Sequence, residues 1–394
     1  MITVLSGGVG AGRFLQGLVQ VVPQKDVAIV SNTGDDLELF GLHVSPDIDI
    51  VIYHLASNYS DSPLRDESRS FPKAEGFNPQ ECSYSLDAPG GAASMPPPLG
   101  GGGKPFLQQP LVNEETGWGL AGDTFHALDA LARFGHETWF SLGDRDLATS
   151  IHRTYLLRQG RTLSQATAEI ARAFGLDVTI LPMSDEPVRT RVETPDGLLD
   201  FQEYMVKRGA ADPFRGLKLA GIEDAKPAPG VIEAITSAEG VIIAPSNPIV
   251  SIGPILALPG VRAALRQTEA RVVAVSPIVG GAVLKGPAAK MLEGLRMEVS
   301  AWQVGWLYQD FLDCLVIDVA DAGDRARIEA LGLDVVVADT IMKGMEEKAA
   351  LARRVVQATR GPRIQARHSE QSEESERGTT DPSLGSATVL SVKT

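Results

Sequence analysis

The sequence is poor in cysteine, in long apolar runs and in positive charge. Its 394 residues include only two cysteines, Cys82 and Cys314, which lie far apart and form no CxxC spacing. A disulfide framework or a structural zinc site is therefore not expected, and a reducing cytoplasm fits this composition. No apolar run approaches the roughly twenty residues that a membrane-spanning helix needs, so we expect no membrane partner.

The shortage of positive charge limits the class of ligand. Asp and Glu number 50 against 36 Lys and Arg, which gives a net charge of −14. Such a surface repels polynucleotides, so we expect no nucleic-acid partner. A small anionic ligand is still compatible with this charge, because backbone N–H groups, a few basic side chains and a divalent cation reverse the potential locally.

Two segments lack the periodic apolar residues of folded domains. Residues 57–111 are rich in Pro, Gly and Ser, and residues 366–394 are polar and low in complexity. Neither segment can bury enough apolar surface to offset the entropy of ordering it, so we predict that both are disordered. A structureless loop of this length is unusual inside a domain, so residues 57–111 are interpreted as an insertion. Residues 1–56 and 112–365 then form a single α/β domain.

The remaining residues alternate between short β-branched runs and amphipathic helical patterns. The predicted strands are 2–6, 27–31, 138–142, 178–183, 240–246, 271–277, 314–319 and 334–340. This alternation predicts a Rossmann-like α/β fold with a mostly parallel sheet and flanking helices. One segment differs, because two alternating runs within 188–206 surround a Pro-Asp-Gly turn, which predicts an antiparallel hairpin excursion.

The first predicted strand ends in SGGVGAGR, which nearly matches two nucleotide-binding loops and completes neither. In a dinucleotide-binding GxGxxG motif that starts at Gly8, the third glycine position falls on Arg13. In a P-loop that starts at Gly7, Arg13 replaces the lysine and Phe14 replaces the hydroxyl that binds Mg²⁺. The glycines form either a phosphate cradle at a helix N-terminus or a tight strand-to-helix turn. Phe14 cannot bind a metal, so any cation needs ligands elsewhere.

Four acidic residues follow within fifteen positions: Asp35, Asp36, Asp47 and Asp49. Carboxylate oxygens suit Mg²⁺, which usually takes one or two carboxylates together with substrate phosphates. The alternative is structural, with Ser45 or Asp47 capping the helix that begins after Pro46 and the earlier pair solvated in a turn.

Nine blocks of the sequence, in order, resemble the 2-phospho-L-lactate transferase family. They are GGVGAGRFLQGL, SNTGDDLELFGLHVSPDIDIVIYHLA, NEETGWGLAGDTFHAL, LGDRDLATSIHRT, ILPMSDEPVRTRV, DFQEYMVKR, IIAPSNPIVSIGPIL, VSPIVGGAVLKGPAAKM and VADTIM. The resemblance implies a cytoplasmic, homodimeric transferase of coenzyme F420 biosynthesis. Such an enzyme moves a 2-phospholactyl group, or the enolpyruvyl phosphate analogue, from lactyl-2-diphospho-5′-guanosine to the deazaflavin Fo with Mg²⁺ present, and it releases GMP.

The resemblance and the chemistry of the residues together give each site residue an expected role. Asp36 and Asp49 are expected to hold Mg²⁺ and to act in catalysis with Arg13. Phosphate or nucleotide is expected at Gly7, Gly8, Gly10, Arg13, Asn32, Thr33, Ser246, Asn247, Pro248, Ser251, Gly253 and Lys285. Fo is expected at Asp49, Trp118, Asp123, Thr124, His126, Ser141, Asp144 and Arg145. A loose transition state does not strictly need a general base, and Asp49 or Asp123 would be the candidate.

A regulatory protein is the alternative. Proteins of the gluconeogenesis-factor type resemble this chain in the glycine-rich opening and bind nucleotide sugars without known transferase chemistry. The blocks that contain Trp118, Asp123 and Arg145 favour the enzyme, because a nucleotide-binding regulator needs no Fo pocket. An NAD-dependent dehydrogenase does not fit, because the glycine spacing fails and the acidic ribose-binding residue is missing from its expected context.

Deleting residues 57–111 tests the interpretation of this segment as an insertion. We expect the shortened protein to fold and to keep its transferase turnover, because the segment contributes no predicted element of the domain. The measurement is the rate of product formation relative to the full chain. A shortened protein that folds but does not turn over would refute the interpretation.

Overall fold

The computed structural model describes residues 1–56, 111–113, 117–283 and 286–364 of the chain. At its centre is a seven-stranded sheet in which all neighbouring strands are parallel. From one edge to the other the strands are β14 (Asp334–Ala338), β13 (Cys314–Asp318), β10 (Arg271–Val275), β9 (Gly240–Ile243), β1 (Ile2–Ser6), β2 (Val27–Ser31) and β5 (Thr179–Pro182). The predicted Rossmann-like, mostly parallel fold is confirmed.

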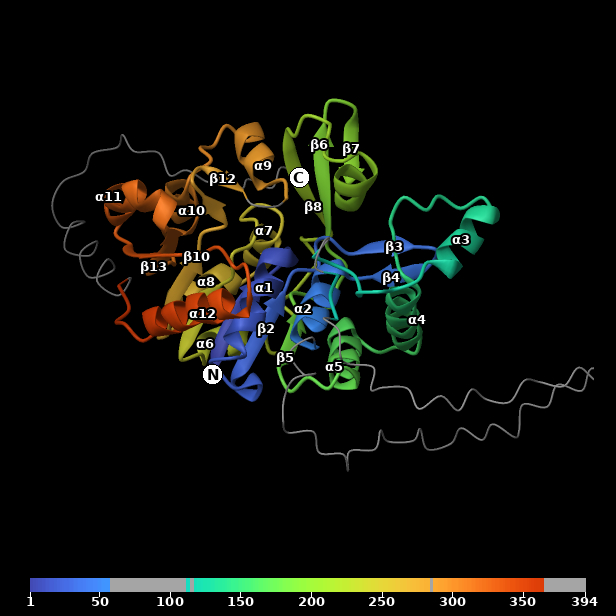
Figure 1. The fold of residues 1–394 in the computed structure, drawn as a ribbon, viewed down its shortest axis with the longest axis horizontal. Helices are drawn as coiled ribbons and strands as arrows, with labels where there is room; N and C mark the ends of the chain where they lie inside the picture. The colour runs from blue at the N-terminus through green and yellow to red at the C-terminus, as the bar shows by residue number, and fades with distance from the viewer. Residues whose placement is uncertain (57–110, 114–116, 284–285, 365–394) are drawn as a thin grey trace, which may run out of the picture.

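Helices cover both faces of this sheet (Figure 1). One face carries α1 (Gly8–Leu18), α2 (Pro46–Ala56), α5 (Leu163–Ala173) and α12 (Met345–Thr359); the other carries α6 (Val231–Thr236), α7 (Ile252–Ala257), α8 (Val261–Gln267), α10 (Ala301–Tyr308) and α11 (Arg325–Glu329). Successive strand residues point to opposite faces, so Val4 and Ile29 pack on the first face while Leu5 and Val30 pack on the second. None of the described helices is long and apolar enough to cross a membrane.

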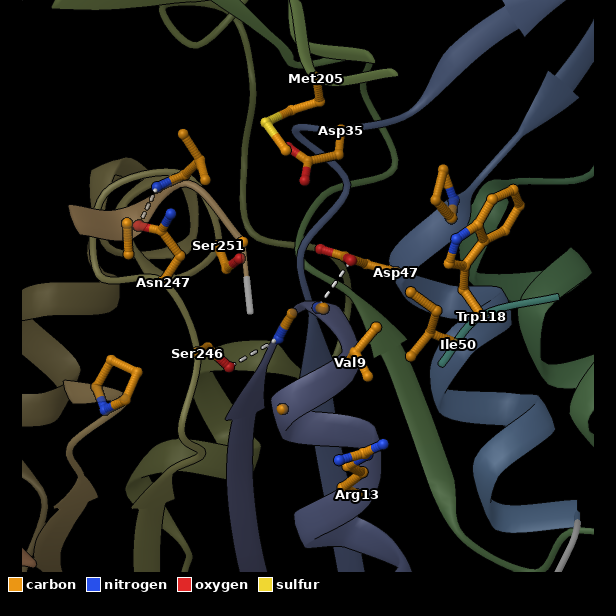
Figure 2. Close-up of a pocket in the computed structure, with 18 of the residues that line it drawn as sticks. Val9, Arg13, Asp35, Asp47, Ile50, Trp118, Met205, Ser246, Asn247 and Ser251 are labelled. Atoms are coloured by element: carbon orange, nitrogen blue, oxygen red, sulfur yellow. Dashed lines mark hydrogen bonds between the residues drawn. The ribbon is translucent and has the colours of Figure 1, made fainter. Parts of the chain in front are cut away.

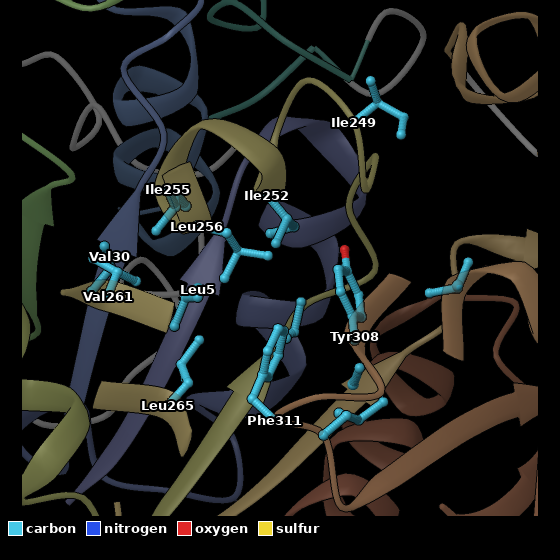
Figure 3. Close-up of a cluster of buried hydrophobic side chains, with 14 of the residues drawn as sticks. Leu5, Val30, Ile249, Ile252, Ile255, Leu256, Val261, Leu265, Tyr308 and Phe311 are labelled. Carbon is cyan, nitrogen blue, oxygen red and sulfur yellow. The ribbon is translucent and has the colours of Figure 1, made fainter. Parts of the chain in front are cut away.

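The larger core cluster anchors the segment that follows β9. In Figure 3, Leu5 and Val30 of the sheet lie beside Ile255 of α7 and Val261 of α8, and all four side chains are buried. Burying a side chain of this size contributes roughly 1.5–3 kcal/mol. This packing holds residues 245–251, which run from β9 to α7, at the carboxyl edge of the sheet.

Three antiparallel units lie outside the central sheet among the described residues. The predicted hairpin is present as β6 (Arg189–Thr194) and β7 (Gly197–Asp200), and β8 (Gly216–Ala220) adds a third strand beside β6. After β7 the chain forms a π-helical turn, Glu203–Lys207, instead of continuing as a strand. The second unit is the hairpin of β3 (Leu37–Leu39) and β4 (Leu42–Val44), which lies near α3 (His126–Arg133) and α4 (Asp144–Arg158) (Figure 1).

A third, smaller antiparallel pair lies beside β13, toward the edge of the sheet that is opposite β5. It consists of β11 (Ile278–Val279) and β12 (Ala282–Val283), and α9 (Ala288–Gly294) follows it. Asp321 accepts hydrogen bonds from the N–H groups of Gly280 (2.9 Å) and Gly281 (3.2 Å), which fixes the turn between the two strands. The turn allows Val279 and Val283 to face the cavity described below.

The predicted strand over 138–142 is absent, and this part of the prediction is wrong. Phe140 and Leu142 are buried, but they belong to a loop that packs against Val44 and Leu147 in a small separate cluster. The N–H of Leu142 donates to the carbonyl of Phe140 (3.0 Å), a local bond that a sheet strand would not make. The alternating apolar residues therefore reflect side-chain burial from a loop rather than pairing with another strand.

Residues 57–110 and 365–394, which contain most of the predicted disordered segments, lie outside the described residues. Leu111, the last residue of the predicted insertion, is described and is 9% exposed. It packs in the core cluster that α1 and α2 share. A deletion that ends at residue 110 keeps this contact.

Gly17→Ala tests the close approach of α1 to α12. A Cβ at Gly17 would lie 2.2 Å from the carbonyl oxygen of Lys348, and this backbone atom cannot rotate away. Alanine by itself would favour the helix by about 1 kcal/mol, but we expect the clash to lower the free energy of unfolding by about 1–2 kcal/mol net. Urea denaturation measures the change. Gly323→Ala is the matched control, because its Cβ would meet no atom within 4 Å; equal stability of the two variants would contradict the packing.

Candidate functional site

A cavity of about 580 Å³ lies at the carboxyl ends of the central strands. Its wall comes from the turn after β1, the loops after β9 and β10, and residues 340–343 after β14. Residues of α2, α4 and the π-helical turn complete it. Parallel sheets bring such loops together at one edge, and α/β folds bind their ligands there.

The glycine-rich turn forms one end of this cavity. The N–H of Gly7 donates to Ser246 Oγ (3.3 Å), and the N–H of Gly8 donates to Asp47 Oδ1 (2.8 Å) (Figure 2). A Cβ at Gly10 would lie 2.2 Å from the carbonyl oxygen of Pro245, so only glycine allows α1 to approach the loop after β9 this closely. The first N–H groups of α1 have no acceptors within the helix, which makes its N-terminus attractive to an anion.

Arg13 follows one turn later on α1 and also lines the cavity. None of the described residues forms a hydrogen bond or an ion pair with its guanidinium group. Arg13 lies further along α1 than the glycine turn and adds positive charge to the same cavity, and a guanidinium group and a helix N-terminus both favour a phosphate group.

Two buried carboxylates face the glycine turn. Asp35 is 6% exposed and Asp47 is 4% exposed, and Figure 2 shows both directed into the same part of the cavity. Burial raises the pKa of Asp35 well above its usual range, and the charge of Asp47 raises it further. Burial also raises the pKa of Asp47 to about 6, although hydrogen bonds from the Asn32 amide and the Gly8 N–H oppose the shift. Asp35 Oδ1 has no hydrogen-bond partner among the described residues.

The two predicted metal ligands, Asp36 and Asp49, have internal partners. Asp36 does not line the cavity; its Oδ2 accepts hydrogen bonds from His43 Nε2 (2.8 Å) and Ser45 Oγ (2.8 Å), and its buried Oδ1 has no hydrogen-bond partner among the described residues. Asp49 lines the cavity but forms an ion pair with Arg153, whose side chain is fully buried. Burial raises the pKa of Asp49, and Arg153 opposes that shift. The assignment of Mg²⁺ to Asp36 and Asp49 stays a prediction.

The far end of the cavity is an aromatic slot formed by Val44, Tyr53, Trp118, Phe140 and Leu142. The rings of Trp118 and Phe140 pack with their centroids 5.8 Å apart. Figure 2 shows Trp118 beside Ile50 of α2, away from Ser246 and Asn247. These side chains give this end of the cavity an apolar, aromatic wall, which is a surface suited to stacking of a planar ligand.

Asp146 lies at this end of the cavity, in the first turn of α4. It is 7% exposed, and its Oδ2 accepts a hydrogen bond from the N–H of Gly143 (3.4 Å). Its Oδ1 is buried and has no hydrogen-bond partner among the described residues. Burial raises the pKa of Asp146 to about 7, and the charges of Asp49 and Asp123 contribute to that shift.

Most of the other predicted Fo-binding residues form the junction of α3 and α4 instead of the cavity wall. Asp123 accepts hydrogen bonds from the N–H groups of Arg145 (3.0 Å) and Asp146 (3.3 Å), so it caps α4. Asp144 accepts from Thr124 Oγ1 (2.5 Å) and from the N–H of His126 (3.2 Å). None of Ser141, Asp123, Thr124, His126, Asp144 and Arg145 lines the cavity. Their assignment to Fo stays a prediction.

The predicted nucleotide-binding residues divide into two groups. Gly7, Gly8, Gly10, Arg13, Ser246, Asn247 and Ser251 line the cavity, whereas Asn32, Thr33, Pro248 and Gly253 do not. Asn32 is fully buried and donates from Nδ2 to Asp47 Oδ2 (2.9 Å) and to the carbonyl of Val250 (3.3 Å). It therefore supports the wall from behind. Lys285 lies outside the described residues.

Sequence reasoning did not identify Arg153, Phe201 or Met205 as site residues. Arg153 lies seven positions after Asp146, which is about two helical turns. This spacing places both residues on one face of α4 and could have predicted that Arg153 lies near the site. Phe201 and Met205 reach the cavity from the segment after β7. The sequence of that segment does not show that the β6–β7 hairpin brings it to the cavity, so neither residue could be predicted from it.

Known proteins match the chain along most of its length. The sequence profile of the 2-phospho-L-lactate transferase CofD family matches residues 2–358. A 2-phospho-L-lactate transferase from Methanosarcina mazei is 36% identical over 356 residues, covering 90% of this chain and 99% of the relative. A phosphoenolpyruvate transferase from Streptomyces griseus is 38% identical over 362 residues, covering 90% of this chain and 97% of the relative.

A solved structure has a similar fold. A member of the UPF0052 family from Bacillus halodurans superposes with a TM-score of 0.53, covering 90% of this chain and 98% of that chain. The two sequences are 14% identical, so this likeness supports the fold alone.

Asp146→Asn tests the electrostatics of the buried carboxyl group. The folded protein keeps a proton on Asp146 up to about pH 7, whereas an unfolded chain releases it near the usual value of 3.8. Stability of the native protein therefore falls as pH rises through this interval, and a neutral Asn avoids the loss. We expect the stability difference, variant minus native, to grow between pH 4 and pH 8 by on the order of 2 kcal/mol. Urea denaturation at the two pH values measures it, and a difference independent of pH would contradict the raised pKa.

Proposed function

The chain belongs to the 2-phospho-L-lactate transferase CofD family, and we propose that it transfers a 2-phospholactyl group from lactyl-2-diphospho-5′-guanosine to the deazaflavin Fo and releases GMP. It is a transferase of coenzyme F420 biosynthesis. The enolpyruvyl analogue of the donor is the second candidate substrate, because the relatives include enzymes named phosphoenolpyruvate transferase.

One observation carries this proposal: a single cavity joins the glycine-rich turn at the N-terminus of α1 to an aromatic slot. The glycine turn, Arg13 and Ser246 are suited to the diphosphate of the donor. The slot around Trp118 and Phe140 is suited to the flat deazaflavin ring. Because both lie in one cavity, the ribityl chain of Fo can reach from the slot to the phosphates.

The proposed reaction is a displacement at phosphorus. The terminal ribityl oxygen forms a bond to the phosphorus that carries the lactyl group, and the bond from that phosphorus to the GMP oxygen breaks. The hydroxyl proton passes to a base or to water, and the electron pair of the broken bond leaves with GMP. Chemistry of this kind depends mainly on alignment of the reactants and on stabilisation of the phosphate charge.

The charges of the cavity favour a divalent cation, and we propose Mg²⁺. Among the described lining residues the acids are Asp35, Asp47, Asp49 and Asp146, and the bases are Arg13 and Lys343. A diphosphate would add further negative charge. The repulsion between the buried Asp35 and Asp47, and the unpartnered Asp35 Oδ1, are features that a cation would relieve. The described residues hold no cluster of three or more potential metal ligands, which agrees with Mg²⁺ bound by two carboxylates and substrate phosphates.

In this arrangement Asp35 and Asp47 would hold the metal ion, which supplies charge neutralisation for the leaving GMP. Asp47 also fixes the turn through Gly8, so it couples the position of the metal ion to that of the diphosphate. Of the two candidate bases for the ribityl hydroxyl, Asp49 lines the cavity and Asp123 does not. Arg153 favours the ionised form of Asp49 that proton acceptance needs.

We also propose that the protein is a homodimer in the cytoplasm, as the family resemblance implies. The described residues include exposed apolar side chains on one excursion from the sheet. Phe134 is 81% exposed after α3, and Ile151 and Tyr155 are 55% and 59% exposed on one side of α4. Such side chains are typical of a surface that another chain covers.

Incubation of the protein with Fo, each donor and Mg²⁺, followed by mass spectrometry, tests the function directly. We expect GMP and phospholactyl-Fo or its enolpyruvyl analogue, and chelation of the metal ion should stop turnover. Asp35→Asn and Asp47→Asn should each lower kcat by about a hundredfold or more, because each removes a charge that holds the cation.

Asp129→Asn on the exposed face of α3 is the control for these two variants and should keep native turnover. Binding of guanosine nucleotide without any binding of Fo would refute the transferase and would favour a nucleotide-binding regulator. Native kcat in both aspartate variants would remove Asp35 and Asp47 from metal binding.

A further inference from the structure

The carboxyl group of Asp146 takes no part in the transfer described above, yet it is buried in the wall of the aromatic slot. We propose that Asp146 recognises the flat acceptor by accepting a hydrogen bond from an N–H or O–H group on the edge of its ring. This inference rests on the proposed function, and it names the residue that selects the ring.

The position of Asp146 supports this role. Asp146 lies on α4, and the chain at Trp118 and Gly119 passes directly beside it, because a Cβ at Gly119 would lie 3.4 Å from Asp146 Oδ2. Tyr53 faces the same end of the cavity from α2; its hydroxyl lies 3.1 Å from Thr149 Oγ1, and the Tyr53 side chain also forms a hydrogen bond that lowers the pKa of Asp146. A ring stacked on Trp118 would therefore direct one edge toward Asp146.

The other carboxylates around the slot are already satisfied. Asp49 is held by both terminal nitrogens of Arg153. Asp123 accepts from the N–H groups that begin α4, and Asp144 accepts from Thr124 and from the N–H groups that begin α3. Asp146 differs from these three because one of its oxygens has no partner although the side chain is 7% exposed. A buried acceptor without a partner is costly unless a ligand or water supplies the missing hydrogen bond.

The chemistry of the slot defines the class of ligand. Its walls are mostly apolar or aromatic, so they favour a planar ring system, and the unpartnered oxygen of Asp146 at its end favours a hydrogen-bond donor on that ring. A 5-deazaflavin carries two donors of this kind, the imide N–H of the pyrimidine ring and the hydroxyl of the benzenoid ring. Burial raises the pKa of Asp146, which shows that the free site is a poor place for an unsolvated charge, and a donor from the ligand would stabilise that charge.

Fluorescence titration of Fo tests the inference in the full chain. We expect Asp146→Asn to weaken Fo binding by about tenfold to a hundredfold. The amide has only one acceptor oxygen, whereas the carboxylate accepts from both the N–H of Gly143 and the proposed donor on the Fo ring. Binding of GDP should not change, and Asp129→Asn should bind Fo like the native protein. Equal affinity for Fo in native protein and Asp146→Asn would overturn the inference while leaving the transferase intact.

Two modified ligands extend the test to the native protein, where folding of a variant is not in question. One carries a methyl group on the imide nitrogen of Fo, and the other carries a methyl group on the ring hydroxyl. We expect one of the two methylated ligands to bind native protein about tenfold more weakly than Fo does. The Asp146→Asn variant should bind that ligand and Fo with equal affinity, because the contact is already lost. If both bind as tightly as Fo, the inference is wrong. If Fo itself does not bind, the proposed function fails, and this inference fails with it.

Discussion

The site depends on the hydrogen bond between the Asp47 carboxylate and the N–H of Gly8 (2.8 Å). This bond joins the first turn of α2 to the first turn of α1, and Asn32 after β2 completes the junction through Asp47 Oδ2. Because three elements meet at one carboxylate, the glycine turn, the acidic pair and the wall of the aromatic slot keep fixed relative positions. Placing Asp47 there lowers the stability of the folded protein, because two carboxyl groups are buried side by side and the pKa values of both Asp35 and Asp47 are raised.

The cavity concentrates negative charge that the fold only partly compensates. Arg153 is fully buried and offsets Asp49, but no comparable ion pair among the described residues serves Asp35 or Asp146. Unsatisfied buried acids lower stability, and they are typical of positions where a protein binds a cation or a polar ligand group. The same arrangement is compatible with the proposed anionic donor, although the chain has a net charge of −14. The positive end of α1 and the Arg13 side chain supply positive charge locally, and the proposed cation would supply more.

The sequence allowed the sheet to be predicted well, because its buried parallel strands are continuous β-branched runs such as 27–31 and 271–275. The run at 138–142 misled the prediction, since an alternating apolar pattern does not distinguish a strand from a loop whose side chains are buried. For the site, the glycine turn and Ser246 were found because turn chemistry leaves a local signal. The proposal of Asp35 and Asp47 as metal ligands differs from the prediction of Asp36 and Asp49, which stays a prediction. The proposal uses contacts that the sequence does not show, because His43 and Ser45 donate to Asp36 and Arg153 pairs with Asp49.

The pairing of β1 with β9 has a consequence for biosynthesis of the chain. Ile2 in β1 lies beside Gly240 in β9, so the first strand to leave the ribosome waits for a neighbour that is made much later. At ordinary rates of translation this delay is on the order of ten seconds or more. During that time one edge of the β1–β2 pair stays unprotected, and an open edge of this kind invites pairing with other chains. The N-terminal half of the nascent chain therefore keeps an open sheet edge until β9 has been made.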